Sequence, residues 1–270
     1  MPLTTITHAM PAREYHAHPG INASTLKAVA KHPLAKVLWD MEHRVHKPAL
    51  DVGSAAHSLI LEGHLNDVEV VDAENWRTKA AREQADEIRA RGMIPMLAHD
   101  ITPIEDMAVS VRSHPVAGEL LHGIAAEVSV FGELYGVQAK ARLDGWHEDA
   151  AHIVDLKTVL STDPAEFHRD VLLWGYHNQA AHYADLMREV TGRDHTFTFV
   201  LVEKAPPYLV SVVTLDEDFL SLGRADNEEA AHAWLNRPVL PINGWPGITT
   251  IQCPVWALPD DDDDDFKEIL

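Results

Sequence analysis

The sequence predicts an α/β fold in which helices flank a central mixed β-sheet. Three stretches of alternating apolar and polar residues follow one another between residues 126 and 159, as expected for strands. A helical pattern over 176–189 separates them from two further strand-like stretches between 197 and 215. A long helix over 216–236 follows. This order of strands, helix, strands and helix favours one α/β domain with a mixed sheet.

The first part of the chain is expected to be mainly helical. The stretch 15–20 is a turn-rich lead-in, Ser24 suits the N-cap of a short helix, and Pro33 suits the first turn of a second one. Residues 51–62 are small and aliphatic, which predicts a buried helix packed closely against a sheet or a ligand. Gly53 and His57 lie one turn apart on one face of this helix.

The middle of the chain alternates short strands with longer helices. Val68–Val71 and Met93–Leu97 have strand-like composition, and a polar helix that ends at Gly92 lies between them. Residues 102–113 are expected to form another helix, and Asp163-Pro164 begins a further segment. We therefore predict a single domain over 1–258, with an acidic and disordered tail over 259–270.

The charge balance restricts the partners of the chain. Its formal charge is −20, and removing the six aspartates of Asp260–Asp265 still leaves −14. Net charge therefore predicts no general attraction to nucleic acid, so DNA binding needs a local basic patch, bound metal ions or an oligomer that gathers its basic residues. An acidic enzyme with a small-molecule substrate is the alternative. The acidic run could also dock a partner protein.

Several features favour a cytoplasmic protein without an ATP-driven motor. The beginning of the sequence shows no signal-peptide pattern, and no apolar run approaches the ~20 residues of a membrane span. Cys253 is the single cysteine, so it forms no internal disulfide and supports no cysteine-based zinc site. No Walker motif is present, which predicts a function without ATP.

The stretch 140–159 is the strongest candidate site. It is expected to form a hairpin in which Asp155 and Lys157, two residues apart on one strand, share a face. If the strands pair antiparallel, Asp144 lies beside them. Two carboxylates and an ammonium group can hold a divalent metal and stabilise a negative transition state. Without further motifs, Asp155 and Lys157 would be an exposed ion pair worth ~0–1 kcal/mol.

The motifs around this hairpin resemble those of the PD-(D/E)XK nuclease superfamily, in the branch with RecB-, Cas4- and lambda-type exonucleases. The matching motifs, in chain order, are Gly53-Ser-Ala-Ala-His57, Glu127, Asp144, Asp155-Leu-Lys157 and Gln179-Ala-Ala-His-Tyr183. Further motifs resemble the RecE-like nucleases, so that the likeness runs from about Tyr15 to Trp256. These are Tyr15-His16 with Pro19-Gly20, His32-Pro33, Asn75-Trp-Arg-Thr-Lys79 and Tyr176-His-Asn-Gln179.

This resemblance implies a restriction-endonuclease-like core and a Mg²⁺-dependent exonuclease, with Mn²⁺ as a substitute. The enzyme would digest one strand of duplex DNA from its 5′ end and leave a 3′ overhang for a RecT-type annealing protein. It would assemble as a ring-shaped homo-oligomer around the DNA. The alternatives are a structure-specific or single-strand nuclease, and a DNA-binding module of the same fold that has lost catalysis.

Roles for individual residues follow from this resemblance and from metal chemistry. Mg²⁺ prefers oxygen ligands, so we expect donors among Asp144, Asp155, Glu127 and the Leu156 carbonyl, with His57 completing the shell or positioning water. Glu119 and Glu133 are alternatives to Glu127. His57 could instead be an ordinary core histidine.

The remaining site residues are expected to handle the phosphate and the DNA. Lys157 would orient water or offset phosphate charge, while Gln179 and Tyr183 would orient Lys157 or hold the DNA backbone; alternatively, both are ordinary helix residues. Predicted DNA contacts are Arg77, Lys79, Arg82, Arg142 and Tyr176. The first three of these could equally be a solvated face.

Overall fold

The computed structural model describes residues 4–43, 48–65, 67–238, 244–245 and 247–254, with the side chains of 48–50 left undescribed. The tail predicted over 259–270 lies outside these residues. The single domain over 1–258 stays a prediction.

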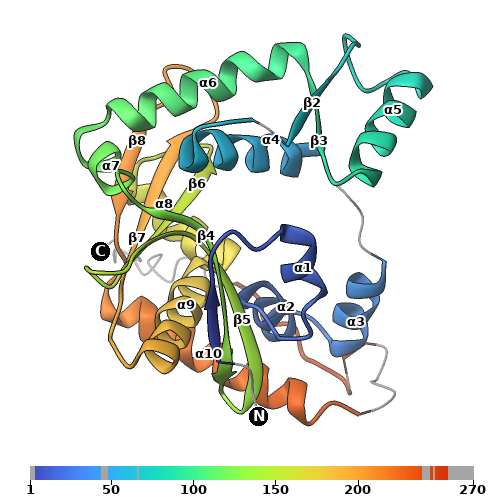
Figure 1. The fold of residues 1–270 in the computed structure, drawn as a ribbon. Coiled ribbons are helices and arrows are strands. Elements are labelled where there is room, and N and C mark those ends of the chain that lie inside the picture. The colour runs from blue at the N-terminus through green and yellow to red at the C-terminus, as the bar shows by residue number, and fades with distance from the viewer. Residues whose placement is uncertain (1–3, 44–47, 66, 239–243, 246, 255–270) are drawn as a thin grey trace, which may run out of the picture.

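A six-stranded mixed sheet forms the centre of the molecule (Figure 1). Its order is β1-β4-β5-β6-β7-β8, and only the β6–β7 pair is parallel. The strands are Thr5–Thr7 (β1), Ala125–Leu134 (β4), Val137–His147 (β5), His152–Val159 (β6), Thr196–Glu203 (β7) and Val210–Val213 (β8). The mixed sheet and the strands predicted between 126 and 215 are thus confirmed, although the last strand is shorter than expected.

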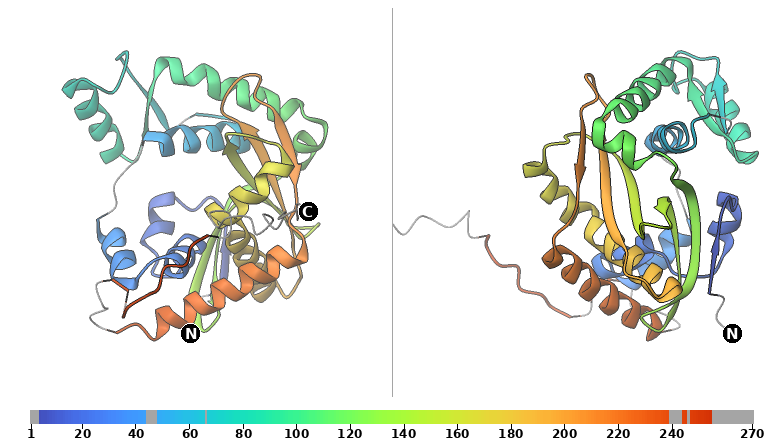
Figure 2. Two further views of the ribbon diagram at one scale, coloured as in Figure 1. Left: turned by 180° about the vertical axis from the view of Figure 1, so that it is seen from behind. Right: turned by 60° about the vertical axis from the view of Figure 1, so that its left-hand side comes forward.

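Helices cover both faces of this sheet (Figures 1 and 2). One face carries α4 (Pro48–His57), the π-helical turn η1 (Ser58–Glu62), α6 (Ala98–Ser113) and α7 (Pro115–Leu120). The other carries α8 (Pro164–Trp174), α9 (Tyr176–Thr191) and α10 (Glu217–Leu235). The α8–α9 pair connects β6 to β7, and such a crossover is what a parallel neighbour requires.

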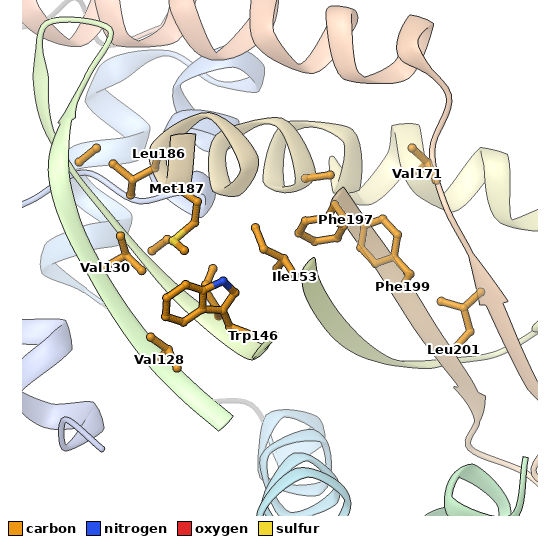
Figure 3. Packing of buried hydrophobic residues seen from close by; sticks show 14 of the residues in the cluster. Val128, Val130, Trp146, Ile153, Val171, Leu186, Met187, Phe197, Phe199 and Leu201 are labelled. Carbon is orange, nitrogen blue, oxygen red and sulfur yellow. The ribbon is translucent and has the colours of Figure 1, made fainter. Parts of the chain in front are cut away.

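The larger core lies between the sheet and helices α8 and α9 (Figure 3). Phe197 and Phe199 are two residues apart on β7, so both side chains point to this side of the sheet. There they pack in the same core as the buried Val171 of α8. The intervening Val200 and Val202 face the second core, under α4 and α6. Because both faces of β6 and β7 are covered by helices, most residues of these two strands are buried, as in parallel strands generally.

The N-terminal helices attach to the sheet near its β4–β5 end. They are α1 (Ala12–Ala17), α2 (Ala23–Lys31) and α3 (Leu34–Glu42). The buried Lys140 of β5 donates to the carbonyls of Tyr15, His16 and His18 at 2.9, 3.3 and 2.6 Å. These bonds hold the C-terminal end of α1 against the sheet.

Some expectations for the N-terminal region were wrong. Residues 12–17, partly expected as a turn, form a helix. The α2 cap is Asn22 rather than Ser24, because the Asn22 side chain accepts from the Thr25 amide at 2.9 Å. Pro33 precedes α3 instead of occupying its first turn.

The two short strands in the middle of the chain form a separate parallel pair. They are β2 (Val68–Val71) and β3 (Ile94–Leu97), connected by α5 (Lys79–Ala90). Gly92 follows α5 in the left-handed region, as expected for a glycine that ends a helix. Among the described helices, none combines the length and the apolar character that a membrane crossing demands.

Candidate active site

The β-sheet brings three carboxylates to one level on adjacent strands. Ala126 pairs with Gly145 and Val128 with Leu143, so Glu127 of β4 lies opposite Asp144 of β5. The β5–β6 ladder ends at the pair Gly145 and Val154, and continuing its register by one residue sets Asp144 opposite Asp155. Residues distant in sequence therefore meet at this point because strand register aligns them.

Strands β5 and β6 separate beyond this level. The Asp144 side chain takes the place of the missing backbone partner, because its Oδ2 accepts from the Leu156 amide at 2.9 Å. β6 then continues beside β7 alone, through pairs such as Leu156 with Val200. The separation opens a space between the strands into which Asp144 can point.

Asp155 and Lys157 lie together, as the period-two spacing predicts. Asp155 is fully buried and forms an ion pair with the Lys157 ammonium group. Its other oxygen accepts from Gln179 Nε2 of α9 at 2.6 Å. Gln179 therefore positions the carboxylate that in turn positions Lys157.

His57 reaches the same place from the last residue of α4. Its Nδ1 lies 3.4 Å from Asp144 Oδ2. One potential ligand atom each from His57, Glu127 and Asp144 lies within 4.8 Å of the others. The π-helical turn η1 follows His57 directly, and such turns are frequent at functional sites.

Glu127 has an unusual backbone conformation for a strand residue. Its φ is 54°, in the left-handed region that non-glycine residues seldom adopt. Its side chain accepts a hydrogen bond from Arg142 Nε, while Arg142 Nη1 donates to the Met10 carbonyl at 2.8 Å. The strand is thus distorted where it presents a potential ligand, as is common at functional sites.

Burial shapes the protonation of the site. It raises the pKa of Asp144 and of Asp155 to about 6, and the nearby Lys157 opposes the shift in both. Burial lowers the pKa of Lys157, but the charges of Asp155 and Asp144 outweigh it, so the net shift is upward. Burial and Lys157 together lower the pKa of His57. At neutral pH the site thus offers carboxylates, an ammonium group and a neutral imidazole.

A cleft of about 370 Å³ opens over this group of residues. Seven residues predicted from the sequence line it: Glu127, Arg142, Asp144, Lys157, Tyr176, Gln179 and Tyr183. Six further lining residues with polar or aromatic side chains were not predicted as site residues: Tyr15, His16, Asn22, Ser24, Lys27 and Trp174. The matching motif Tyr15-His16 and the helix predicted at Ser24 were the sequence signals that pointed to the N-terminal wall.

A family model described as "PDDEXK-like domain of unknown function (DUF3799)" matches residues 23–236, most of the chain. The chain belongs to this PDDEXK-like family. The expected assignment to the PD-(D/E)XK superfamily and its fold is thereby confirmed. No curated protein matches the chain.

Solved structures similar to this chain include two bacterial proteins. A protein from Eubacterium rectale, whose description proposes an exonuclease, is 20% identical with a TM-score of 0.65, covering 87% of this chain and 90% of that one. A phage-related exonuclease from Haemophilus somnus is 11% identical, with a TM-score of 0.36 and coverage of 83% and 96%. The first of these likenesses supports the fold; the second is too distant to carry an argument.

Within this PDDEXK-like domain, the alternatives to Glu127 lie elsewhere. Glu119 is exposed on α7, and Glu133 is exposed near the opposite end of β4, opposite Gln138. Glu127 is therefore the glutamate that accompanies Asp144. Leu156 is fully buried next to Asp144, and its proposed role as a carbonyl ligand stays a prediction.

Three of the predicted DNA contacts lie away from the cleft. Arg77, Lys79 and Arg82 are exposed at the start of α5 and do not line the cleft of the described chain. Lys79 pairs with Glu83, and Arg82 donates to the carbonyls of Thr78 and Arg77. The role of these three residues in DNA contact stays a prediction, whereas Arg142 and Tyr176 do line the cleft.

Proposed function

We propose that this chain is a divalent-metal-dependent DNA exonuclease. The observation that supports the proposal most strongly is that the His57–Glu127–Asp144 cluster lies beside the Asp155–Lys157 pair, with Glu127, Asp144 and Lys157 in the wall of one cleft. A metal-binding group beside a fixed ammonium ion suits the hydrolysis of a negatively charged phosphodiester.

The donor set fits a divalent cation. Glu127 and Asp144 offer carboxylate oxygens, and His57 offers a neutral imidazole nitrogen. The pKa values of the partly buried Asp144 and the fully buried Asp155 are both raised to about 6, so negative charge is held there at a cost that a nearby cation would reduce. Oxygen donors suit Mg²⁺ and Mn²⁺, and the imidazole makes Mn²⁺ an effective substitute. A bound cation would act as a Lewis acid on the phosphate and lower the pKa of water.

The side chains of the chain supply the remaining parts of the reaction. Lys157, fixed by Asp155, would offset charge on the phosphate or orient the attacking water. Gln179 would keep Asp155 in the orientation that holds this lysine. Tyr183, whose hydroxyl keeps its proton because burial raises its pKa well above 10, would donate a hydrogen bond to the DNA backbone.

The finer details rest on the resemblance to RecE-like nucleases. They are a duplex substrate, digestion from the 5′ end, Mg²⁺ as the usual metal, a toroidal homo-oligomer, and a RecT-type annealing partner in the cytoplasm. A ring would also reconcile DNA binding with the charge of −20, because inward-facing basic residues could line the channel. The likeness of the fold to the Eubacterium rectale protein, whose description proposes an exonuclease, is consistent with the exonuclease part of this proposal.

The decisive experiment is digestion of end-labelled linear duplex DNA with Mg²⁺, Mn²⁺, Ca²⁺ or EDTA. We expect release of nucleotides from the 5′ end with Mg²⁺ or Mn²⁺ and none with EDTA. Lys157→Ala should lower the rate on the order of 10²–10³-fold, as removal of an electrostatic group typically does. Lys36→Ala, which changes an exposed lysine that does not line the cleft and has no predicted site role, serves as the matched control.

The substrate series separates the competing functions. Faster cleavage of flaps or single strands than of blunt duplex would replace the proposal by a structure-specific or single-strand nuclease. Binding of duplex without any release of nucleotides would indicate a DNA-binding module without catalysis. Activity that survives Lys157→Ala would exclude the proposed site.

A further inference from the structure

Trp174 is a large aromatic side chain exposed in the wall of the cleft. It is the last residue of α8, and 52% of it is accessible to solvent. Within the described chain, its indole makes no ring contact and no side-chain hydrogen bond, whereas the more exposed Trp39 stacks on His43 at 3.6 Å. The apolar face of Trp174 is therefore free to contact a molecule in the cleft.

The backbone that carries Trp174 is held firmly. Lys27 Nζ of α2 donates to the Trp174 carbonyl at 2.8 Å, and Lys31 Nζ donates to the carbonyls of Leu172 and Leu173 at 2.9 Å. These lysines satisfy carbonyls that the end of a helix otherwise leaves without partners. An aromatic group on a fixed backbone loses little conformational freedom when it binds a ligand.

Gly175 completes this arrangement. It adopts a φ of 65°, and a Cβ atom there would come within 2.5 Å of the Lys27 side chain. The next residue, Tyr176, places its ring 5.3 Å from Lys157 Nζ. The close turn at Gly175 therefore sets Trp174 two residues from an aromatic ring that contacts the proposed catalytic lysine.

We propose that Trp174 is a stacking platform for a nucleobase of the DNA strand that enters the cleft. This inference rests on the proposed function. A nucleobase is the fitting ligand because an uncharged aromatic face binds bases by stacking, whereas the phosphate would be met by Lys157. Stacking tolerates any base sequence, which suits an exonuclease that must move along DNA.

The test compares duplexes whose ends carry bases with duplexes whose ends carry none. We expect Trp174→Ala to lower kcat/KM on an oligonucleotide duplex roughly 5- to 100-fold, the range expected for loss of one stacked base. Hydrolysis of the same duplex with abasic tetrahydrofuran residues at its ends should stay nearly unchanged, and Trp174→Phe should recover most of the activity on the normal duplex. Leu173→Ala is the matched control, because Leu173 is 63% exposed next in sequence but does not line the cleft.

A binding measurement tests the same contact without catalysis. Fluorescence of an oligonucleotide carrying terminal 2-aminopurine, bound in Ca²⁺, should be quenched by the wild type and recover in Trp174→Ala. Quenching that persists in this variant would overturn the proposal even if the wild type cuts no DNA. Equal loss on both hydrolysis substrates would also overturn it. A change in the oligomeric state of Trp174→Ala would overturn the proposal as well, because it would place the indole between copies of the chain.

Discussion

Asp144 and Asp155 are carboxylates that the fold withdraws from water without a full set of cationic partners. In metal-free protein, their pKa is raised from 3.8 to about 6 by burial. Between pH 3.8 and about 6, the folded state therefore binds more protons than the unfolded state. The stabilisation from each protonated group is complete below pH 3.8 and is lost as pH rises through about 6.

Asp144→Asn should therefore stabilise the metal-free protein at pH 8 while removing a proposed metal ligand. We expect the free energy of unfolding to rise by about 1–3 kcal/mol, because asparagine avoids the cost of burying a charge and can still accept from the Leu156 amide. Urea unfolding in EDTA measures this gain. Near pH 4, where wild-type Asp144 is protonated in the folded state, the gain should shrink toward zero.

Metal addition supplies the control for this prediction. Mn²⁺ should raise the Tm of the wild type, because a ligand that binds only the folded state stabilises it. The rise should be small or absent in Asp144→Asn. A variant that is less stable than the wild type in EDTA at pH 8 would contradict the proposed charge burial.

At the residue scale, sequence reasoning found the residues whose relation is local or set by strand period. Asp155 and Lys157 share a face because they are two residues apart, and the structure confirms their contact. Lys27 and Trp174 escaped notice because they lie 147 positions apart, and only the packing of α2 against the end of α8 joins them. No local pattern encodes such a contact.

At the scale of elements, two helical glycines differ in the space that is available for a side chain. In α4, a Cβ atom on Gly53 would meet nothing within 4 Å. In α10, a Cβ atom on Gly223 would come within 2.3 Å of the His177 carbonyl oxygen of α9. Gly223 therefore permits the close approach of α9 and α10, while the fold itself imposes no such requirement at Gly53.

Alanine at these two positions should have effects of opposite sign. Gly53→Ala should stabilise the protein by about 0.5–1 kcal/mol through helix propensity. Gly223→Ala should destabilise it by about 1–3 kcal/mol, because the helices must move apart. Denaturant unfolding of both variants in EDTA measures the difference. Destabilisation of similar size at both positions would show that α4 is packed more tightly than described.

Length helped but did not decide which elements were predictable, because the four-residue β2 and β3 were predicted while the eleven-residue α8 was foreseen only as a segment that begins at Asp163-Pro164. The helix α9 and strands β4, β5 and β6 each have enough residues to display a period. The three-residue β1 and the six-residue α1 and α7 do not, and none of them was predicted as an element. The positive φ of Glu127 was equally unpredictable, because glutamate carries no preference for that conformation.

At the scale of the whole molecule, the net negative charge opposes the proposed binding of DNA. The formal net charge of the chain is −20, and carboxylates line the cleft that a phosphate would have to enter. The proposed affinity for DNA would therefore depend on cations that neutralise the cleft, in addition to any basic surface.

We expect the affinity for duplex DNA to rise at least about tenfold when Ca²⁺ replaces EDTA at constant ionic strength, because cation binding removes this repulsion. Fluorescence anisotropy with a labelled duplex measures the change. In Asp144→Asn the gain should be smaller. Equal affinity of the wild type in Ca²⁺ and EDTA would mean that DNA binds by a surface separate from the cleft.

The fold class was predictable as a whole because the order of elements determines which connections are possible. The mixed sheet follows from strands interrupted by a helical crossover. The separate β2–β3 pair was not foreseen, because the composition of a short strand does not say which sheet it joins. Pairing is decided by packing partners that lie elsewhere in the chain.

The common level of Glu127, Asp144 and Asp155 also has a consequence for how this chain can change in length. The three residues meet only while both strand pairings keep their register. An inserted residue in the turn at 148–151 could be absorbed by the turn, whereas one inside β5 before Asp144 would turn its carboxylate to the opposite face. Tolerance of insertions and deletions should therefore change abruptly at the strand ends, independently of which residue is added.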